Sequence, residues 1–266
     1  MVNPNYAQGT AIGQRAAAVD AGLKAHMNSV YALMTGAMVL TGLVAYVVGM
    51  DLNAVVDYAR ANGGQIAGAD TALLPPSIVA AMFSSPIKWV VMFAPLIFVF
   101  AFSAMIYRMS TATAQTVFWI FGAVMGLSIA HIFAVFTGVS IAQTFFATAA
   151  GFGALSLYGY TTKKDLSGWG SFLFMGLISL IIVSLLNIFI FESSALQWAI
   201  SGAGVLLFAA LTAYDTQSIK NEYLELRGTP GGEAVLEKGA VLGALRLYLD
   251  FLNMFMFLLQ FMGNRE

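Results

Sequence analysis

The chain has 266 residues, of which 59% are hydrophobic and 9% are charged, and its formal net charge is −1. Soluble domains carry about 25% charged residues, so this composition cannot cover a water-facing surface and indicates a multi-pass membrane protein. The near-neutral charge argues against a nucleic-acid partner, and the absence of cysteine excludes disulfides, thiol catalysis and Cys-ligated zinc. With two histidines, a histidine metal site is not expected, and the 13 acidic residues remain as candidate cation ligands.

The N-terminal segment is rich in small and polar residues. It lacks the basic start and compact apolar core of a cleavable signal peptide. We therefore interpret residues 1–27 as a soluble N-terminal arm and residues 28–266 as a seven-span transmembrane domain.

Seven segments are long and apolar enough to cross a hydrocarbon core about 30 Å thick, which takes about 20 residues. In chain order, the expected spans are residues 30–50, 87–107, 116–136, 139–160, 169–191, 196–216 and 240–262. The predicted fold is an all-α membrane protein.

Two of the connections carry signals of their own. Residues 76–83, within the long first connection, are expected to form a short interfacial helix. The sixth connection, residues 220–239, is charged and contains RGTPGG, so we expect a turn and a loop that partly protrudes into the cytoplasm. Within the third span, Gly122 and Gly126 form a GxxxG pattern that favours close helix packing in lipid.

The distribution of lysine and arginine near the span ends predicts the orientation. With the N-terminus in the cytoplasm, eight of these residues lie on the cytoplasmic side and three on the other side. The cytoplasmic eight are Arg15, Lys24, Arg108, Lys163, Lys164, Lys220, Arg227 and Lys238; the other three are Arg60, Lys88 and Arg265. The contrast favours a cytoplasmic N-terminus, and a re-entrant last segment would weaken it only slightly.

The last span carries a polar stripe. Arg246, Asp250, Asn253 and Gln260 are spaced so that they share one face of a helix. An ionisable group at mid-bilayer costs about 2.5–3.5 kcal/mol on insertion scales, so it faces protein or a wet cavity. The stripe therefore predicts that other helices enclose the last span.

Asp215, at the cytoplasmic end of the sixth span, is the expected partner of Asp250. Two carboxylates close together in a low dielectric cannot both stay charged cheaply, so the pair should titrate as a unit. It can share a proton, bind a cation or be neutralised by an arginine. The alternative is an internal Arg246–Asp250 ion pair, with Asp215 capping a helix end or reaching water. Tyr214, Tyr248 and Asn253 supply more polarity than that alternative requires.

His131 is expected in the middle of the third span. A lone histidine there is more often a buried hydrogen-bonding residue than a proton relay, and the hydrogen-bonding role is favoured.

Two late motifs resemble a known family. The segments AYDTQSIK, residues 213–220, and ALRLYLDFLNMFMFLLQ, residues 244–260, are similar to the paired motifs of the Bax-inhibitor (transmembrane BAX inhibitor motif) family, bacterial branch. The resemblance covers about residues 25–263. It implies six helices around a central C-terminal helix and a pH-sensitive calcium leak, with Asp215 and Asp250 as a di-aspartyl sensor. It also implies an arginine latch on the second span, for which Arg108 is the counterpart here. The connection between the two aspartates is longer here than the family pattern implies.

Three functions follow for comparison. The leading hypothesis is a cation leak gated by the Asp215/Asp250 pair, which would also be the Ca²⁺ site, since carboxylate oxygens suit Ca²⁺. The second is an interaction protein that modulates a membrane-bound AAA protease through the N-terminal arm, as the resemblance suggests. The third, an intramembrane aspartyl hydrolase, is disfavoured because the Gly-x-Gly-Asp context is absent, so no enzymatic activity is expected.

The remaining expectations concern surroundings. No cofactor is expected, with Ca²⁺ as a permeant or regulatory ion. The expected partners are membrane lipid, Ca²⁺, protons and a membrane protease, with no nucleic acid. The expected location is the bacterial inner membrane.

Overall fold

The protein is a bundle of long helices. The computed structural model describes residues 4–265, with side chains described for residues 19–265. The elements in chain order are α1 (Pro4–Ala61), α2 (Pro76–Ser84), α3 (Ile87–Met105), η1 (Ile106–Arg108), α4 (Thr111–Ile129), η2 (Ala130–Ala134), α5 (Gly138–Thr161), η3 (Ser167–Trp169), α6 (Gly170–Leu186), η4 (Asn187–Phe191), α7 (Ser194–Leu226) and α8 (Gly232–Met262). Residues 4–265 contain no strand, and a single antiparallel bridge joins Phe136 to Arg265.

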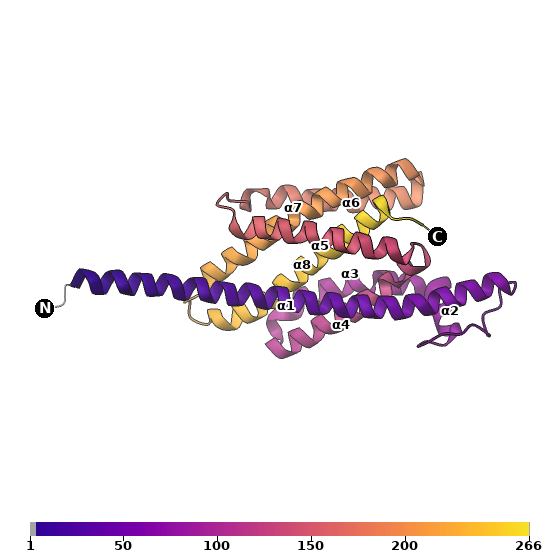
Figure 1. Cartoon of the computed structure of the whole chain (residues 1–266), viewed down its shortest axis with the longest axis horizontal. Coiled ribbons are helices and arrows are strands. Elements are labelled where there is room, and N and C mark those ends of the chain that lie inside the picture. Colours follow the sequence, from indigo (N-terminus) through magenta and orange to yellow (C-terminus); the bar gives the residue numbers. More distant parts are fainter. Residues whose placement is uncertain (1–3, 266) are drawn as a thin grey trace.

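Seven helical segments are long and apolar enough to cross a membrane, which confirms the all-α fold and the number of spans. The short helix expected in the first connection is α2. Helix α1 begins at one end of the bundle and α8 finishes at the other, so the last segment crosses the whole bundle instead of re-entering (Figure 1). The expected cytoplasmic N-terminus stays a prediction.

The boundary between arm and membrane domain is not marked by a break in α1. The helix continues through residue 27, and Leu23 and Met27 are buried in the main core. The division at residues 27 and 28 stays a prediction; residues 1–3 of the arm lie outside the described part of the chain.

The turn expected at RGTPGG is confirmed, but the connection between the last two spans is much shorter than the predicted residues 220–239. Helix α7 continues to Leu226 and α8 begins at Gly232, so residues 227–231 alone form the turn. The flanking residues 221–226 and 233–238 consist mostly of strong helix formers, which extend both helices beyond their apolar parts. Gly228 and Gly231 have φ of 78° and 76°, a conformation that glycine adopts without strain.

Helix α8 is the most buried span. In its apolar window 61% of the residues are buried, against 39% or less in the other six. It packs against α1, α4, α5 and α7 and crosses diagonally between α1 and the group formed by α5, α6 and α7 (Figure 1). Encirclement of α8 by all six other spans stays a prediction.

The GxxxG segment packs closely against α1, as expected. A methyl group added at Gly126 would lie 2.7 Å from the carbonyl oxygen of Thr41, and one added at Gly122 would lie 3.1 Å from that of Ala37. The Thr41 hydroxyl donates to a carbonyl oxygen, with Gly122 at 2.8 Å and Ala37 at 2.9 Å, and contacts the Tyr248 hydroxyl at 2.7 Å. These contacts attach the last span, α8, to α1 and α4.

Candidate functional site

The polar stripe of α8 lies along α7. The short turn between these helices makes them antiparallel neighbours, so polar residues of α8 meet polar residues of α7 at successive levels. Arg246 meets Glu222, Asp250 meets Asp215, and Gln260 meets Gln197 (listed from the α7–α8 turn toward the far end). The stripe thus gains protein partners, as its spacing requires.

We call this contact, with its pairs Arg246–Glu222, Asp250–Asp215 and Gln260–Gln197, the α7–α8 seam. Asp250 belongs to its middle pair. The residue is 4% exposed, and its Oδ2 atom is buried without a hydrogen-bond partner. The carboxyl group of Asp215 lies beside that of Asp250. Because ionised carboxylates only accept hydrogen bonds, the two groups can bond to each other only when one carries a proton. The geometry therefore offers two ways of satisfying the pair, a shared proton or a bound cation.

Arg246 does not form the alternative i,i+4 ion pair with Asp250. Its Nη1 atom lies 3.8 Å from Oε2 of Glu222, and the two side chains are 42% and 31% exposed. The guanidinium is still close enough to act electrostatically on both aspartates. Glu222 was not among the predicted site residues, although it stands seven residues after Asp215, two turns along the same face of α7.

A polar cavity of about 230 Å³ lies next to this end of the seam. Its lining includes Tyr214, Glu222 and Glu225, together with Ser167 at the start of the preceding span. Tyr214 also packs against Gly170, where a methyl group would clash with its ring. Two further carboxylates therefore line water-accessible space close to the aspartate pair, and Tyr214 lies in this wall.

Tyr248 and Asn253, the other supporting residues, do not contact the aspartates through a hydrogen bond. Tyr248 is fully buried and faces α1 and α4 through its bond to Thr41. Asn253 donates from Nδ2 to the carbonyl oxygen of Leu249 in its own helix at 2.8 Å. Tyr248 thus fixes α8 against its neighbouring helices, and the side chain of Asn253 is hydrogen-bonded within its own helix.

The expectation of a buried, mid-span His131 is wrong. Ser110 caps α4 by accepting from the N–H of Thr113 at 3.1 Å, so the helix begins at Thr111, five residues earlier than predicted, and ends at Ile129. His131 falls in η2, where it is exposed and its Nδ1 lies 3.0 Å from the Ser128 carbonyl oxygen.

Arg108 is exposed at the end of η1. Neither of the two ion pairs found among residues 19–265 involves it. Lys238 of α8 donates to the carbonyl oxygen of the adjacent Tyr107 at 3.2 Å, which places Arg108 near the α7–α8 turn. Its role as a latch stays a prediction.

At the far end of the seam, Gln260 belongs to a cluster of amides whose other members, Gln197 and Asn187, were not predicted from the sequence. Gln197 donates to Oε1 of Gln260 at 2.8 Å and accepts from the buried Asn187 at 3.2 Å. Asn187 opens η4, a π-helical turn, and its Oδ1 accepts from the N–H of Ser193 at 3.0 Å. The polar partners of α8 therefore continue from one end of the bundle toward the other.

The seam does not form a preassembled metal centre. Within residues 19–265, no group of three or more His, Cys, Asp or Glu side chains is placed to hold a metal ion. Ca²⁺ takes six to eight oxygen ligands, so a cation at the aspartate pair would need water or carbonyl oxygens in addition.

Comparison with known proteins agrees with this architecture. A model of the family described as inhibitor of apoptosis-promoting Bax1 matches residues 23–266. The inner membrane protein YbhL of Escherichia coli is 41% identical over 249 residues, which cover 92% of this chain and 94% of that protein. An uncharacterised protein of Caulobacter vibrioides is 40% identical over 266 residues, covering 99% and 98%. A protein of Rickettsia prowazekii, RP147, is 38% identical over 247 residues, covering 93% and 92%.

The match covers all seven spans, including the seam between α7 and α8. The chain is a multi-pass integral membrane protein and belongs to the Bax1-inhibitor family.

Proposed function

We propose that this protein is a Ca²⁺ leak whose conductance is controlled by protonation of the Asp215/Asp250 pair. The observation that carries the proposal is the buried Asp250 carboxyl group, which has an oxygen without a partner and a second acid beside it. A structural carboxylate would be expected to have its oxygens hydrogen-bonded at such depth, because burying an unpaired charge is costly. A site that exchanges a proton for a cation must keep this oxygen available.

The chemistry of the pair suits a permeant ion rather than a stored one. Carboxylate oxygens are the ligands that Ca²⁺ prefers, and two carboxylates are fewer than the six to eight oxygens it needs. Water or carbonyl oxygens would complete the shell, so binding is weak and the ion can leave. Glu222 and Glu225, in the adjoining polar cavity, would concentrate cations at the entrance.

Proton and cation compete for the same oxygens, so the leak should depend on pH. In proteoliposomes loaded with a Ca²⁺ indicator, wild-type influx should therefore vary with pH. Asp215→Asn and Asp250→Asn should each flatten this dependence, because an amide neither titrates nor binds Ca²⁺ strongly.

The matched control is Asp57→Asn, which removes an exposed acid of α1 that pairs with Arg60. This variant should keep the wild-type pH profile. Unchanged pH profiles in both seam variants would refute the proposal. Because no step in it breaks a covalent bond, we also infer that the protein is not an enzyme.

A second function, binding to a membrane-bound AAA protease, is favoured by one feature. Helix α1 continues as a helix beyond the rest of the bundle toward the N-terminus (Figure 1). Removal of residues 1–18, which stops short of the buried Leu23, should abolish co-purification with such a protease and leave the Ca²⁺ leak intact. Retention of the protease by the shortened chain would contradict this role.

A further inference from the structure

An open groove of about 520 Å³ separates α1 from α5. Its volume falls within the roughly 300–1,000 Å³ of small-molecule sites. The walls are largely apolar, with Met27 on α1 and Phe152 and Leu157 on α5. Because both helices are membrane spans and Leu157 is 62% exposed, the groove opens sideways toward the bilayer.

A glycine in the lining leaves free space in the groove. Gly153 lies in the lining, and a methyl group added there would meet nothing within 4 Å. Deeper in, the hydroxyl of Tyr31 contacts that of Ser156 at 2.5 Å and joins the two helices. These two hydroxyls are therefore paired with each other, and the apolar side chains around them leave a slot that suits a hydrocarbon chain.

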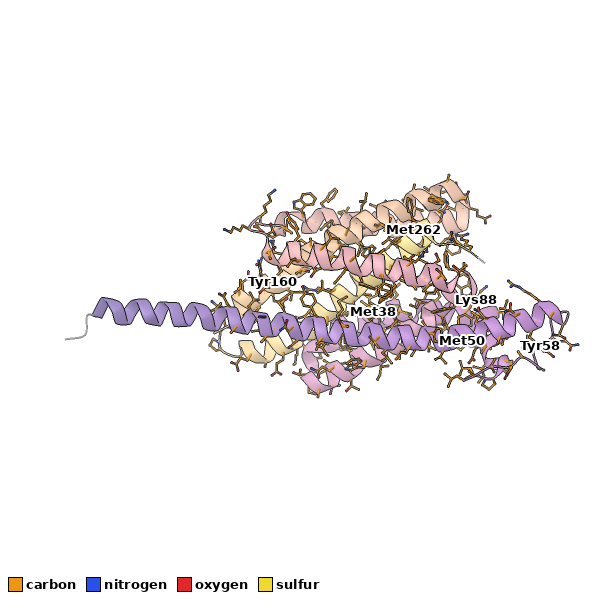
Figure 2. The ribbon with its side chains drawn as sticks, in the orientation of Figure 1. Met38, Met50, Tyr58, Lys88, Tyr160 and Met262 are labelled. Atoms are coloured by element: carbon orange, nitrogen blue, oxygen red, sulfur yellow. The ribbon has the colours of Figure 1, made fainter. Side chains whose placement is uncertain are left out.

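One end of the groove is basic. Lys24 belongs to the lining and is exposed, near Tyr160 in the last turn of α5. Tyr160 lies close to α1 at the end of the bundle from which α1 extends (Figure 2). Lys220 donates to the Tyr160 carbonyl oxygen at 2.8 Å, and Lys163 and Lys164 follow the C-cap residue of α5. An anionic group at this end would meet the ammonium group of Lys24, as in the basic pockets between spans that bind lipid headgroups.

We propose that this groove is a binding site for an anionic phospholipid. One acyl chain lies between Met27, Phe152 and Leu157, and the phosphate contacts Lys24. The apolar slot alone would accept any phospholipid; the basic end selects the anionic ones.

The site is connected to the aspartate seam. Ser156, beneath the groove, contacts the hydroxyl of Thr216 on α7 at 2.9 Å, and Thr216 directly follows Asp215. A lipid that holds α1 and α5 in place would thus also hold the wall of the seam. The consequence for Ca²⁺ flux rests on the proposed function, whereas lipid binding does not.

Binding can be tested on the purified full-length protein by native mass spectrometry. The probes are dioleoyl phosphatidylglycerol and dioleoyl phosphatidylcholine, added at equal concentration after delipidation. Wild-type protein should retain the anionic lipid about fivefold more strongly, which corresponds to one favourable lysine–headgroup contact. Lys24→Gln should abolish this preference, whereas Lys88→Gln, at the opposite end of the bundle (Figure 2), should preserve it.

The groove itself is tested by a pair of glycine variants. Gly153→Leu should fill the slot and reduce retention of both lipids. Gly151→Leu is the matched control, since Gly151 lies in the same helix outside the lining and also has nothing within 4 Å. Thermal unfolding of all four variants checks that each one folds.

The possible outcomes separate the two proposals. Equal retention by Gly153→Leu and Gly151→Leu, or a headgroup preference unchanged by Lys24→Gln, would overturn the lipid site. Ca²⁺ flux is measured in vesicles with and without phosphatidylglycerol. If the four variants change lipid binding as predicted but the protein carries no Ca²⁺ flux, the lipid site is supported and the leak is contradicted.

Discussion

Two buried aspartates of this protein have opposite surroundings. Asp51, near the end of the membrane part of α1, is 1% exposed and Asp250 is 4% exposed. The carboxylate of Asp51 accepts from three successive backbone N–H groups, those of Ala72, Leu73 and Leu74, at 2.6–3.3 Å. Asp250 instead faces another acid and keeps one oxygen without a partner.

The difference separates a structural acid from a functional one. The backbone donors around Asp51 compensate its charge and fasten residues 72–74 of the first connection over the end of α1. The surroundings of Asp250 offer no such compensation, so the protein keeps a group that is costly in a folded interior. Burial alone would class the two residues together, and their partners distinguish them.

The largest expected effect comes from removing the structural acid. Asp51→Ala leaves three backbone N–H groups without their acceptor and should lower the free energy of unfolding by about 3 kcal/mol. Thermal unfolding in detergent, followed by tryptophan fluorescence, measures this. Asp57→Ala, six residues further along α1, removes only an exposed ion pair with Arg60 and should cost less than about 0.5 kcal/mol. Equal losses of stability in Asp51→Ala and Asp57→Ala would show that the hydrogen bonds of Asp51 do not hold the first connection in place.

The functional acid should behave in the opposite way. Asp250→Asn should change the free energy of unfolding by less than about 1 kcal/mol at pH 7, because it removes a buried acid that lacks a compensating partner. The same thermal scans apply, with Asp51→Asn beside them; that variant should be the less stable, since an amide nitrogen would face backbone donors. A loss of stability in Asp250→Asn as large as in Asp51→Ala would break the comparison.

Arg246 should have a smaller effect on stability and a measurable one on gating. The Nη1–Oε2 distance to Glu222 is 3.8 Å and both side chains are partly exposed, so Arg246→Gln should cost less than about 0.5 kcal/mol. A positive charge near the two aspartates favours their ionised forms. Its removal should therefore move the pH midpoint of the Ca²⁺ leak to higher pH. Glu222→Gln controls for loss of the pair itself, and identical midpoints in Arg246→Gln and wild type would rule out this influence.

The smallest effect concerns a third acid, exposed in the α5–α6 connection. The Asp165 carboxylate accepts a hydrogen bond from the hydroxyl of Ser167 and another from the backbone N–H of Ser167. Both bonds, the hydroxyl's more than the N–H's, lower the pKa of this carboxyl below 3.8. A lowered pKa means that the contribution to stability is present above about pH 3.8 and is lost as the pH falls through the folded-state pKa. Ser167→Ala should raise the pKa of Asp165 toward 3.8, measured by NMR titration of its carboxyl carbon in micelles. An unchanged titration would show that the hydroxyl contributes nothing.

The residues of the site that could be predicted from the sequence are those whose spacing along one helix places them on a common face. The offsets of Arg246, Asp250 and Gln260 placed them on one face of α8, and this face does meet polar residues of α7. Asp215 was predicted as the neighbour of Asp250 because one connection joins the end of the sixth span to the start of the seventh. Glu222 was missed because its charge appeared to belong to a loop, and α7 in fact continues four residues beyond it.

Other features depend on residues far apart in the chain. Asp51 receives its hydrogen bonds from residues 72–74, some 21 to 23 positions later, and Tyr248 finds Thr41 at a separation of 207. The position of His131 depended on where the Ser110 cap starts α4, five residues before the apolar span was expected to begin. Hydropathy indicates where a segment is apolar, and capping determines where the helix begins.

The sequence by itself determined the membrane class, the seven spans, the polar face of the last span and the family. These follow from composition and from the 3.6-residue period of a helix, which are local properties. Tertiary structure alone decided which partners meet that face, that Asp51 is compensated and Asp250 is not, and that a groove with a basic end remains between α1 and α5. The reason is that helix periodicity specifies the direction of a side chain, whereas the packing of the helices sets their register and spacing.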